Sequence, residues 1–188
     1  MKNIQIMENI QTYNRFKEAI QKEMITSFGE HIKTYNSIGF ELSKHPVVGN
    51  NKMSLYLDES TMPAGYDNLA DLYNKSVVYG IWTPKANKFY IGKTEDIGER
   101  LVTHSKDTRS KKATLFMDLR KGPAIFFIIG VCDKKYLSKA ESTGIACAKD
   151  FSARLFCETN TKNADFYYKF YKEFKNEKNN IYCYNIKD

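Results

Sequence analysis

The chain has 188 residues, which is enough for one domain with a buried core, and 42% hydrophobic with 27% charged residues indicates a water-soluble protein. The longest apolar run, residues 124–131, is too short to span a membrane, and no secretory signal follows the first methionine. The net charge of +7 favours a polyanionic partner. Four widely spaced cysteines indicate free thiols in a reducing compartment. We therefore expect a cytoplasmic location without membrane contact.

The N-terminal part of the chain predicts a mainly helical extension. Residues 8–36 favour a helix that is broken near Gly29, and four apolar side chains repeat at intervals of four within it, as on a packing face. Residues 37–75 contain short apolar pieces separated by proline and glycine. We therefore treat residues 1–76 as an extension whose role the sequence does not indicate.

A β-hairpin is predicted next. Residues 77–82 and 88–91 are β-branched and aromatic runs, separated by Thr-Pro-Lys-Ala-Asn. A hairpin centred on residues 84–85 would place Tyr79 directly opposite Tyr90, with the two phenols on one face of the sheet and about 5 Å between their Cβ atoms. Such a pair either stabilises the sheet or forms part of a site, and the hairpin alone does not decide between the two.

Helices and one further strand follow the hairpin. Residues 94–104 have helix signals with Thr94 as N-cap, and a second helix is expected over residues 112–120. The apolar run 124–131 predicts the most buried strand, and residues 135–149 predict a third helix.

The order β-β-α-α-β-α predicts an α+β domain over residues 77–160, built on a small three-stranded antiparallel sheet that helices flank. Residues 161–188 form a tail rich in lysine and aromatic residues that is compatible with a helix.

Basic side chains follow the tyrosine hairpin at suggestive positions. Lys93 lies at the junction of strand and helix, and Arg100 and His104 are four residues apart, so they share one helix face. That face borders the packing side of the helix, so the basic pair can lean over the sheet. Two phenols, an ammonium, a guanidinium and an imidazole within reach of each other would form an electropositive site suited to phosphate.

Glu141 is a candidate metal ligand. It falls on the apolar side of the third predicted helix, where a carboxylate without a partner is unfavourable. Mg²⁺ takes oxygen ligands and often binds through one or two carboxylates with waters and phosphate oxygens. The alternative is an ordinary glutamate at the edge of a packing face.

These residues together resemble the signature of the GIY-YIG nuclease superfamily. Val-Val-Tyr ending at Tyr79, ten intervening residues, and Tyr-Ile-Gly starting at Tyr90 fit its spacing, with Lys93, Arg100 and His104 in frame. The Tyr-Ile-Gly-Lys-Thr strand end looks most like the phage-encoded endonuclease II group. The resemblance implies a central three-stranded antiparallel sheet flanked by helices. Val77 departs from the family's first glycine.

The resemblance also implies roles for the residues. Tyr79 or Tyr90 would activate the attacking water, and the sequence does not decide which. Lys93 and His104 would assist the proton transfer, Arg100 would bind the scissile phosphate, and Glu141 would hold one divalent ion, Mg²⁺ or Mn²⁺. The family's asparagine after the metal ligand is nearest in order to Asn160, with Asn163 and Asn185 as rivals.

We therefore expect a metal-dependent endonuclease that hydrolyses DNA phosphodiester bonds. The alternative is a catalytically inactive module of this fold that binds nucleic acid or protein. Arg109, Lys111 and Lys112 lie in a basic stretch that either tracks the DNA backbone or forms a solvated loop. A two-strand cut needs a homo-oligomer or two successive nicks. If the protein is phage-encoded, its location is the host cytoplasm.

Overall fold

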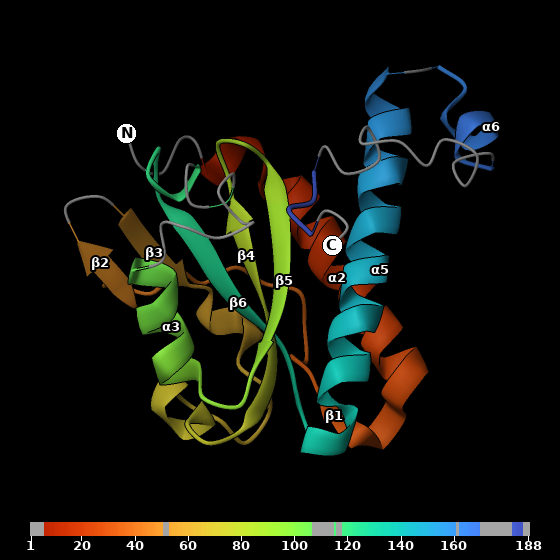
Figure 1. The fold of residues 1–188 in the computed structure, drawn as a ribbon. Coiled ribbons are helices and arrows are strands. Elements are labelled where there is room, and N and C mark those ends of the chain that lie inside the picture. The colour runs from red at the N-terminus through yellow and green to blue at the C-terminus, as the bar shows by residue number, and fades with distance from the viewer. Residues whose placement is uncertain are drawn as a thin grey trace.

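The computed structural model describes residues 6–50, 53–106, 115, 118–160, 162–169 and 182–185. A mixed sheet lies between two layers of helices (Figure 1). Helices α2 (Ile10–Phe28) and α5 (Lys134–Asn160) cover one face of the sheet, and α3 (Ile97–Lys106) covers the other. Each face therefore has its own apolar core.

The sheet has the strand order β2-β3-β6-β4-β5. All neighbouring pairs are antiparallel except β3 with β6, which is parallel, and β1 pairs with β6 off this path. The strands are β1 (Ile32–Lys33), β2 (Val48–Asn50), β3 (Met53–Leu57), β4 (Ser76–Thr83), β5 (Lys88–Thr94) and β6 (Ala124–Cys132).

The predicted α+β class is confirmed, but the sheet is larger than the three strands expected. Strands β6, β4 and β5 form the predicted antiparallel unit, and the additional strands come from the N-terminal part of the chain. The outer edge of β6 is covered in two halves, because β3 pairs with residues 124–126 and β1 with residues 131–132. An apolar strand that is buried along most of its length cannot leave such an edge open to water.

Helix α2 joins this core through the predicted apolar stripe. Phe16, Ile20 and Met24 have no exposed surface, and Phe28 retains 6%. The ring of Phe16 stacks on Phe89 of β5 with centroids 4.1 Å apart. The helix ends at Gly29, whose φ of +53° is a left-handed conformation that glycine adopts readily. The boundary at residue 76 stays a prediction, although the segment before it packs on the same sheet.

A buried ion pair ties α2 to the segment that follows β3. Lys17 Nζ lies 2.8 Å from Asp58 Oδ2, and the two side chains are 1% and 0% exposed. Tyr13 donates a hydrogen bond to the same carboxylate oxygen, and the amide and hydroxyl of Ser60 donate to the other. Lys17 also donates to the Gly39 carbonyl. Burial lowers the pKa of Lys17, and the Asp58 charge opposes that shift.

Two helices differ from their predicted bounds. Helix α3 begins at Ile97, because Thr94 is the last paired residue of β5 and Asp96 provides the cap, accepting a hydrogen bond from the Glu99 amide at 3.0 Å. Helix α5 runs eleven residues past the predicted end at residue 149, since its buried apolar positions continue to Leu155.

Other predicted helices are described only in part. Within the predicted helix 112–120, residues 115, 118 and 119 are helical. Residues 112–114, 116 and 117 lie outside the described residues. Helix α6 (Ala164–Lys169) lies in the predicted C-terminal tail, and residues 170–181 are not described. Within the described part of the chain, no helix combines the length and apolar character needed to cross a bilayer.

Candidate active site

The hairpin places the two tyrosines as diagonal rather than direct neighbours. Tyr79 pairs with Gly92, and Tyr90 pairs with Ile81, so the predicted direct pairing is wrong. The turn spans residues 84–87, whereas the predicted hairpin was centred on residues 84–85. Each residue of β4 therefore pairs with a residue of β5 two positions later than predicted. A shift of two keeps both side chains on one face, and their ring centroids lie 6.3 Å apart at a tilt of 50°.

Gly92 is required by the close approach of Tyr79. A Cβ atom added to Gly92 would lie 2.6 Å from Tyr79 Oη and 3.0 Å from Tyr90 Cε1, distances that no real side chain tolerates without displacement. The Tyr79 phenol thus reaches over the backbone of β5 where a side chain would otherwise stand. The glycine of the Tyr-Ile-Gly motif therefore has a steric function here.

Tyr79 is a neutral phenol in this environment. Its side chain is fully buried and stacks on Phe126 with centroids 5.0 Å apart. Burial raises the pKa of Tyr79 well above its usual value of 10, Tyr90 and the Glu141 charge add to the rise, and the Arg100 charge partly opposes it. Loss of solvent thus outweighs the effect of the nearby cation on this pKa.

Strand β5 lies between the helices that carry Arg100 and Glu141. Figure 1 shows α3 on one side of this strand and α5 on the other. Tyr90 belongs to the core on the α3 face, whereas Ile91 belongs to the core on the α5 face. Alternation along the strand therefore directs Lys93 toward α5. The charges of Arg100 and Glu141 both shift the pKa of the Tyr79 phenol, in opposite directions.

Lys93 joins the strand to helix α5. Its Nζ donates a hydrogen bond to Ser138 Oγ at 2.7 Å and lies 3.4 Å from Glu141 Oε2. The Lys93 and Glu141 side chains are 36% and 24% exposed, so the pair is accessible to solvent. Helix α5 approaches β5 closely at Gly144, where an added Cβ would lie 3.1 Å from an Ile91 methyl carbon. Lys93 and Glu141 are thus direct neighbours in the structure.

The C-terminal segment places an asparagine on the tyrosine strand. Asn185 Oδ1 accepts from the Ile91 amide at 2.7 Å, and its Nδ2 donates to the Ile91 carbonyl at 2.9 Å. Asn160 lies at the end of α5, nineteen residues past Glu141, a distance of about 28 Å along the helix. Asn163 follows it and is exposed. The structure therefore brings Asn185, and not the predicted Asn160, to the candidate site.

The residues before Asn185 continue this attachment along β5. The Phe89 amide donates to the Tyr182 carbonyl at 2.8 Å, and the Tyr184 amide donates to the Phe89 carbonyl at 2.7 Å. Tyr184 Oη also donates to Asp118 at 2.7 Å. The segment thereby covers the free edge of β5 as a short parallel strand would. Nothing local in the sequence indicates this contact, because its partners lie about 90 residues apart.

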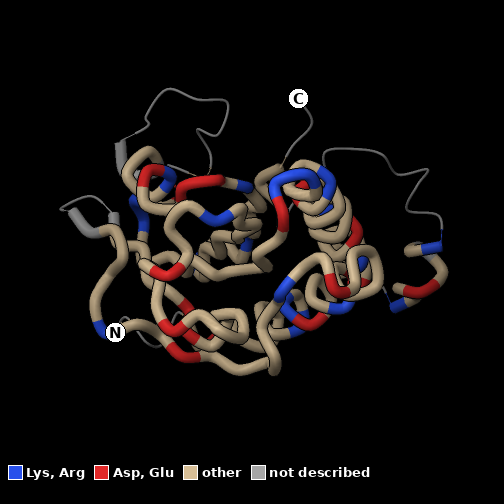
Figure 2. The backbone as a smooth tube through the Cα atoms, turned by 90° about the horizontal axis from the view of Figure 1, so that it is seen from below, with Lys and Arg blue, Asp and Glu red and all other residues tan. Residues whose placement is uncertain are grey.

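Several predicted site residues are placed only in part. His104 lies on α3 one turn beyond Arg100, as expected, but its side chain is outside what the structure describes. Arg109, Lys111 and Lys112 all lie outside the described residues. Figure 2 views the molecule toward the end where α5 begins, and there basic and acidic positions of the described chain are interspersed rather than gathered into one basic face.

The carboxylates available for a metal are few. Among the described residues, no group of three or more histidine, cysteine, aspartate or glutamate side chains could hold an ion. Glu141 is a partly exposed carboxylate, which fits a hard cation that binds through one carboxylate with waters and phosphate oxygens. Its chemistry suits Mg²⁺ or Mn²⁺ better than a structural metal with a closed protein shell.

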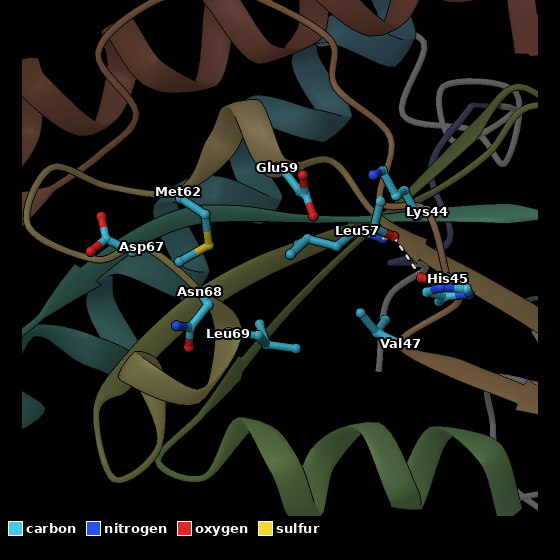
Figure 3. Close-up of a pocket in the computed structure, with 10 residues that line it drawn as sticks. Lys44, His45, Val47, Leu57, Glu59, Met62, Asp67, Asn68 and Leu69 are labelled. Atoms are coloured by element: carbon cyan, nitrogen blue, oxygen red, sulfur yellow. Dashed lines mark hydrogen bonds between the residues drawn. The ribbon is translucent and has the colours of Figure 1, made fainter.

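A separate pocket of about 380 Å³ lies beside β3 (Figure 3). Its floor is apolar and its rim carries exposed polar side chains, among them Lys44, His45, Glu59 and Asp67. None of the predicted site residues lines it. The solvent-accessible part of the candidate site, Lys93 with Glu141, lies outside this pocket.

Residues 75–145 match the family of the GIY-YIG catalytic domain. The matched range contains both tyrosines, Lys93, Arg100 and Glu141, and it ends before Asn185. No curated protein and no solved structure matches the chain. The match supports the superfamily inferred from the motif spacing, and it indicates nuclease activity in general.

Proposed function

We propose that this chain, with its GIY-YIG catalytic domain at residues 75–145, is a metal-dependent endonuclease that hydrolyses DNA phosphodiester bonds. The observation that supports the proposal is that Arg100 of α3 and Glu141 of α5 are both near enough to shift the pKa of the Tyr79 phenol, while Lys93 of β5 contacts Glu141. Phosphate cleavage requires a cation on the phosphate, an acceptor for the proton of water and neutralisation of the leaving oxygen, and these residue types supply them.

Arg100 binds the scissile phosphate in this proposal. Its helix begins at Ile97, shortly after β5 ends at Thr94, and its charge influences the Tyr79 phenol. A guanidinium offers several donors in a fixed plane and keeps its charge throughout the working pH range. It therefore orients the phosphate and stabilises the charge that develops on it, and His104 one turn further on assists the proton transfer.

The two tyrosines have different environments, which bears on the choice of base. Tyr79 has a raised pKa and stays neutral at physiological pH, so before substrate binds it acts by orienting water through its hydroxyl. Tyr90 is 4% exposed and lies closer to the surface. We propose that one of the two tyrosines accepts the proton of the attacking water as a phenolate that forms once substrate and the divalent ion are bound, and single Phe substitutions at the two positions will separate their roles.

Glu141 holds the divalent ion in this proposal. When bound, Mg²⁺ or Mn²⁺ would neutralise the charge on the leaving oxygen. The carboxylate is partly exposed and its described partner is the Lys93 ammonium, at 3.4 Å rather than at ideal contact distance. Glu141 can therefore exchange that partner for an ion without leaving a buried charge unpaired.

Plasmid nicking in the presence of Mg²⁺ tests the proposal. Arg100→Ala and Glu141→Gln should each reduce the rate at least about 100-fold, the scale seen when a group that stabilises transition-state charge is removed. Arg15→Ala and Glu158→Gln are matched controls, because they break a half-exposed ion pair of N···O distance 2.9 Å about 25 Å along α5 from Glu141. Equal loss in the control variants, or full activity of the site variants, would contradict the proposal.

A non-catalytic nucleic-acid-binding module is the second candidate. It is favoured by Val77, which stands where the family has a glycine and is fully buried in the α3-side core. Salt-dependent DNA binding without cleavage in the presence of Mg²⁺ or Mn²⁺ would support this candidate.

Membership of the phage-encoded endonuclease II group and the oligomeric state stay predictions.

A further inference from the structure

The Lys93 ammonium is shared unequally between two acceptors on α5. Its nearer partner is the uncharged Ser138 hydroxyl at 2.7 Å, and its farther partner is the Glu141 carboxylate at 3.4 Å. Coulomb attraction alone would bring a flexible lysine onto the carboxylate, as Lys17 lies on Asp58 at 2.8 Å. The serine therefore competes successfully for the ammonium in a place where the carboxylate should prevail.

Helix geometry explains why both acceptors are within reach. Ser138 and Glu141 are three residues apart on α5, so they lie on one face, one turn above the other. Lys93 is fixed at its backbone by pairing with Val78 inside the sheet. Its ammonium can thus move between the two acceptors only over a short arc, and each step toward Ser138 opens the Glu141 carboxylate.

We propose that Ser138 is a positioning residue that holds the Lys93 ammonium away from Glu141 and so keeps the carboxylate available for a divalent cation. The inference rests on the proposed function, in which Glu141 is the metal ligand. A cation bound to Glu141 has to replace the lysine as its partner. When a cation replaces Lys93 as the partner of Glu141, the ammonium still has the Ser138 hydroxyl as its hydrogen-bond acceptor. Lys93 therefore is not left unpaired and stays beside the site.

Titration of the full chain with Mn²⁺ by isothermal calorimetry tests this inference without DNA and without turnover. Ser138→Ala removes the second acceptor without changing any charge, so Lys93 should occupy Glu141 more fully. The Kd for Mn²⁺ should then rise about two- to tenfold, the size of one typical net hydrogen-bond contribution. Ser138→Thr, which keeps the hydroxyl, should stay within about twofold of the wild type.

Ser142→Ala is the matched control. Ser142 also lies beside Glu141 on α5, but its hydroxyl donates to the Ser138 carbonyl at 3.0 Å rather than binding Lys93. Its removal should leave the Kd unchanged. Thermal melting of each variant should match the wild type, because Ser138 and Ser142 are both exposed.

The outcomes separate this inference from the function on which it rests. If Glu141→Gln abolishes Mn²⁺ binding while Ser138→Ala binds as tightly as the wild type, the metal site stands and the role of Ser138 is wrong. If Glu141→Gln binds Mn²⁺ like the wild type, or the wild type shows no binding, the proposed metal site fails and the inference with it. A weaker Ser138→Ala variant that Ser138→Thr does not rescue also overturns the inference.

Discussion

Two lysine–carboxylate pairs lie in different parts of the molecule and differ in almost every physical respect. Lys17 and Asp58 are sealed under helix α2, with 1% and 0% of their side chains exposed and 2.8 Å between them. Lys93 and Glu141 lie at the flank of β5, with 36% and 24% exposed and 3.4 Å between them. The same kind of ion pair is thus buried and in close contact in one place, and partly exposed to water with a longer separation in the other.

The difference shows which pair supports the fold and which can exchange its partner. Both oxygens of Asp58 have hydrogen-bond donors, from Tyr13, Ser60 and the Glu41 amide in addition to Lys17. A charge inside a protein costs several kcal/mol unless its hydrogen bonds are satisfied in this way. Glu141 keeps access to water instead, so replacement of its lysine by another cation carries no such cost.

The largest expected effect is on stability, from breaking the sealed pair. Asp58→Ala leaves the Lys17 ammonium buried without its carboxylate and should lower the free energy of unfolding by about 3–5 kcal/mol. Urea denaturation followed by circular dichroism measures this. A loss below about 1 kcal/mol, the size typical of exposed pairs, would remove the contrast between the two regions.

The opposite pattern is expected at the exposed pair. Glu141→Gln should lower the rate of DNA nicking at least about 100-fold while it changes the free energy of unfolding by less than about 1 kcal/mol. Nicking rates and urea denaturation of the same preparation measure both. A variant that loses stability as much as Asp58→Ala does would show that Glu141 supports the fold instead.

Alkaline pH provides a comparison between the phenols of the two regions. Burial raises the pKa of both Tyr13, beside the sealed pair, and Tyr79, in the candidate site. A phenol with a raised folded-state pKa contributes stability that is present below pH 10 and is lost as the pH rises further, because only the unfolded chain then ionises.

Each phenol should therefore contribute a loss of up to about 1.4 kcal/mol per pH unit between pH 10 and pH 11. Tyr13→Phe and Tyr79→Phe should each flatten the measured dependence of the unfolding free energy on pH by that amount relative to the wild type. An unchanged slope in Tyr79→Phe would mean that this phenol ionises in the folded protein. It would then serve as a phenolate base more readily than its burial indicates.

The smallest effect is expected where the C-terminal segment meets the site. Asn185→Ala removes two hydrogen bonds to the Ile91 backbone and should cost about 1–2 kcal/mol of stability. The nicking rate should fall as well, because Ile91 lies between Tyr90 and Gly92. Asn160→Ala is the control, since among the described residues its side chain donates to the Phe156 carbonyl at the end of α5. Equal effects of both substitutions would show that Asn185 has no special link to the site.

Local patterns in the sequence were sufficient for the class of fold and the frame of the site. The four-residue stripe from Phe16 to Phe28 predicted the buried face of α2, and the apolar run 124–131 predicted β6. The motif spacing indicated Tyr79, Tyr90 and the basic residues after them as candidate site residues, and a helix face indicated Glu141; their roles stay predictions. These features follow from side-chain periodicity and from the regular rise of helices and strands, which depend on neighbouring residues only.

Tertiary structure decided the contacts between distant segments. The hairpin register depended on a four-residue turn in which Asn87 adopts a positive φ of 51°. Three contacts illustrate this: β1 pairs with the outer edge of β6, Asn185 binds the Ile91 backbone, and Lys93 binds Ser138. They join residues that are 45 to about 100 positions apart in the sequence. Such contacts form where a strand edge, a backbone amide or an ammonium still needs a partner after local structure has formed, and no periodicity in the sequence records which distant residue supplies it.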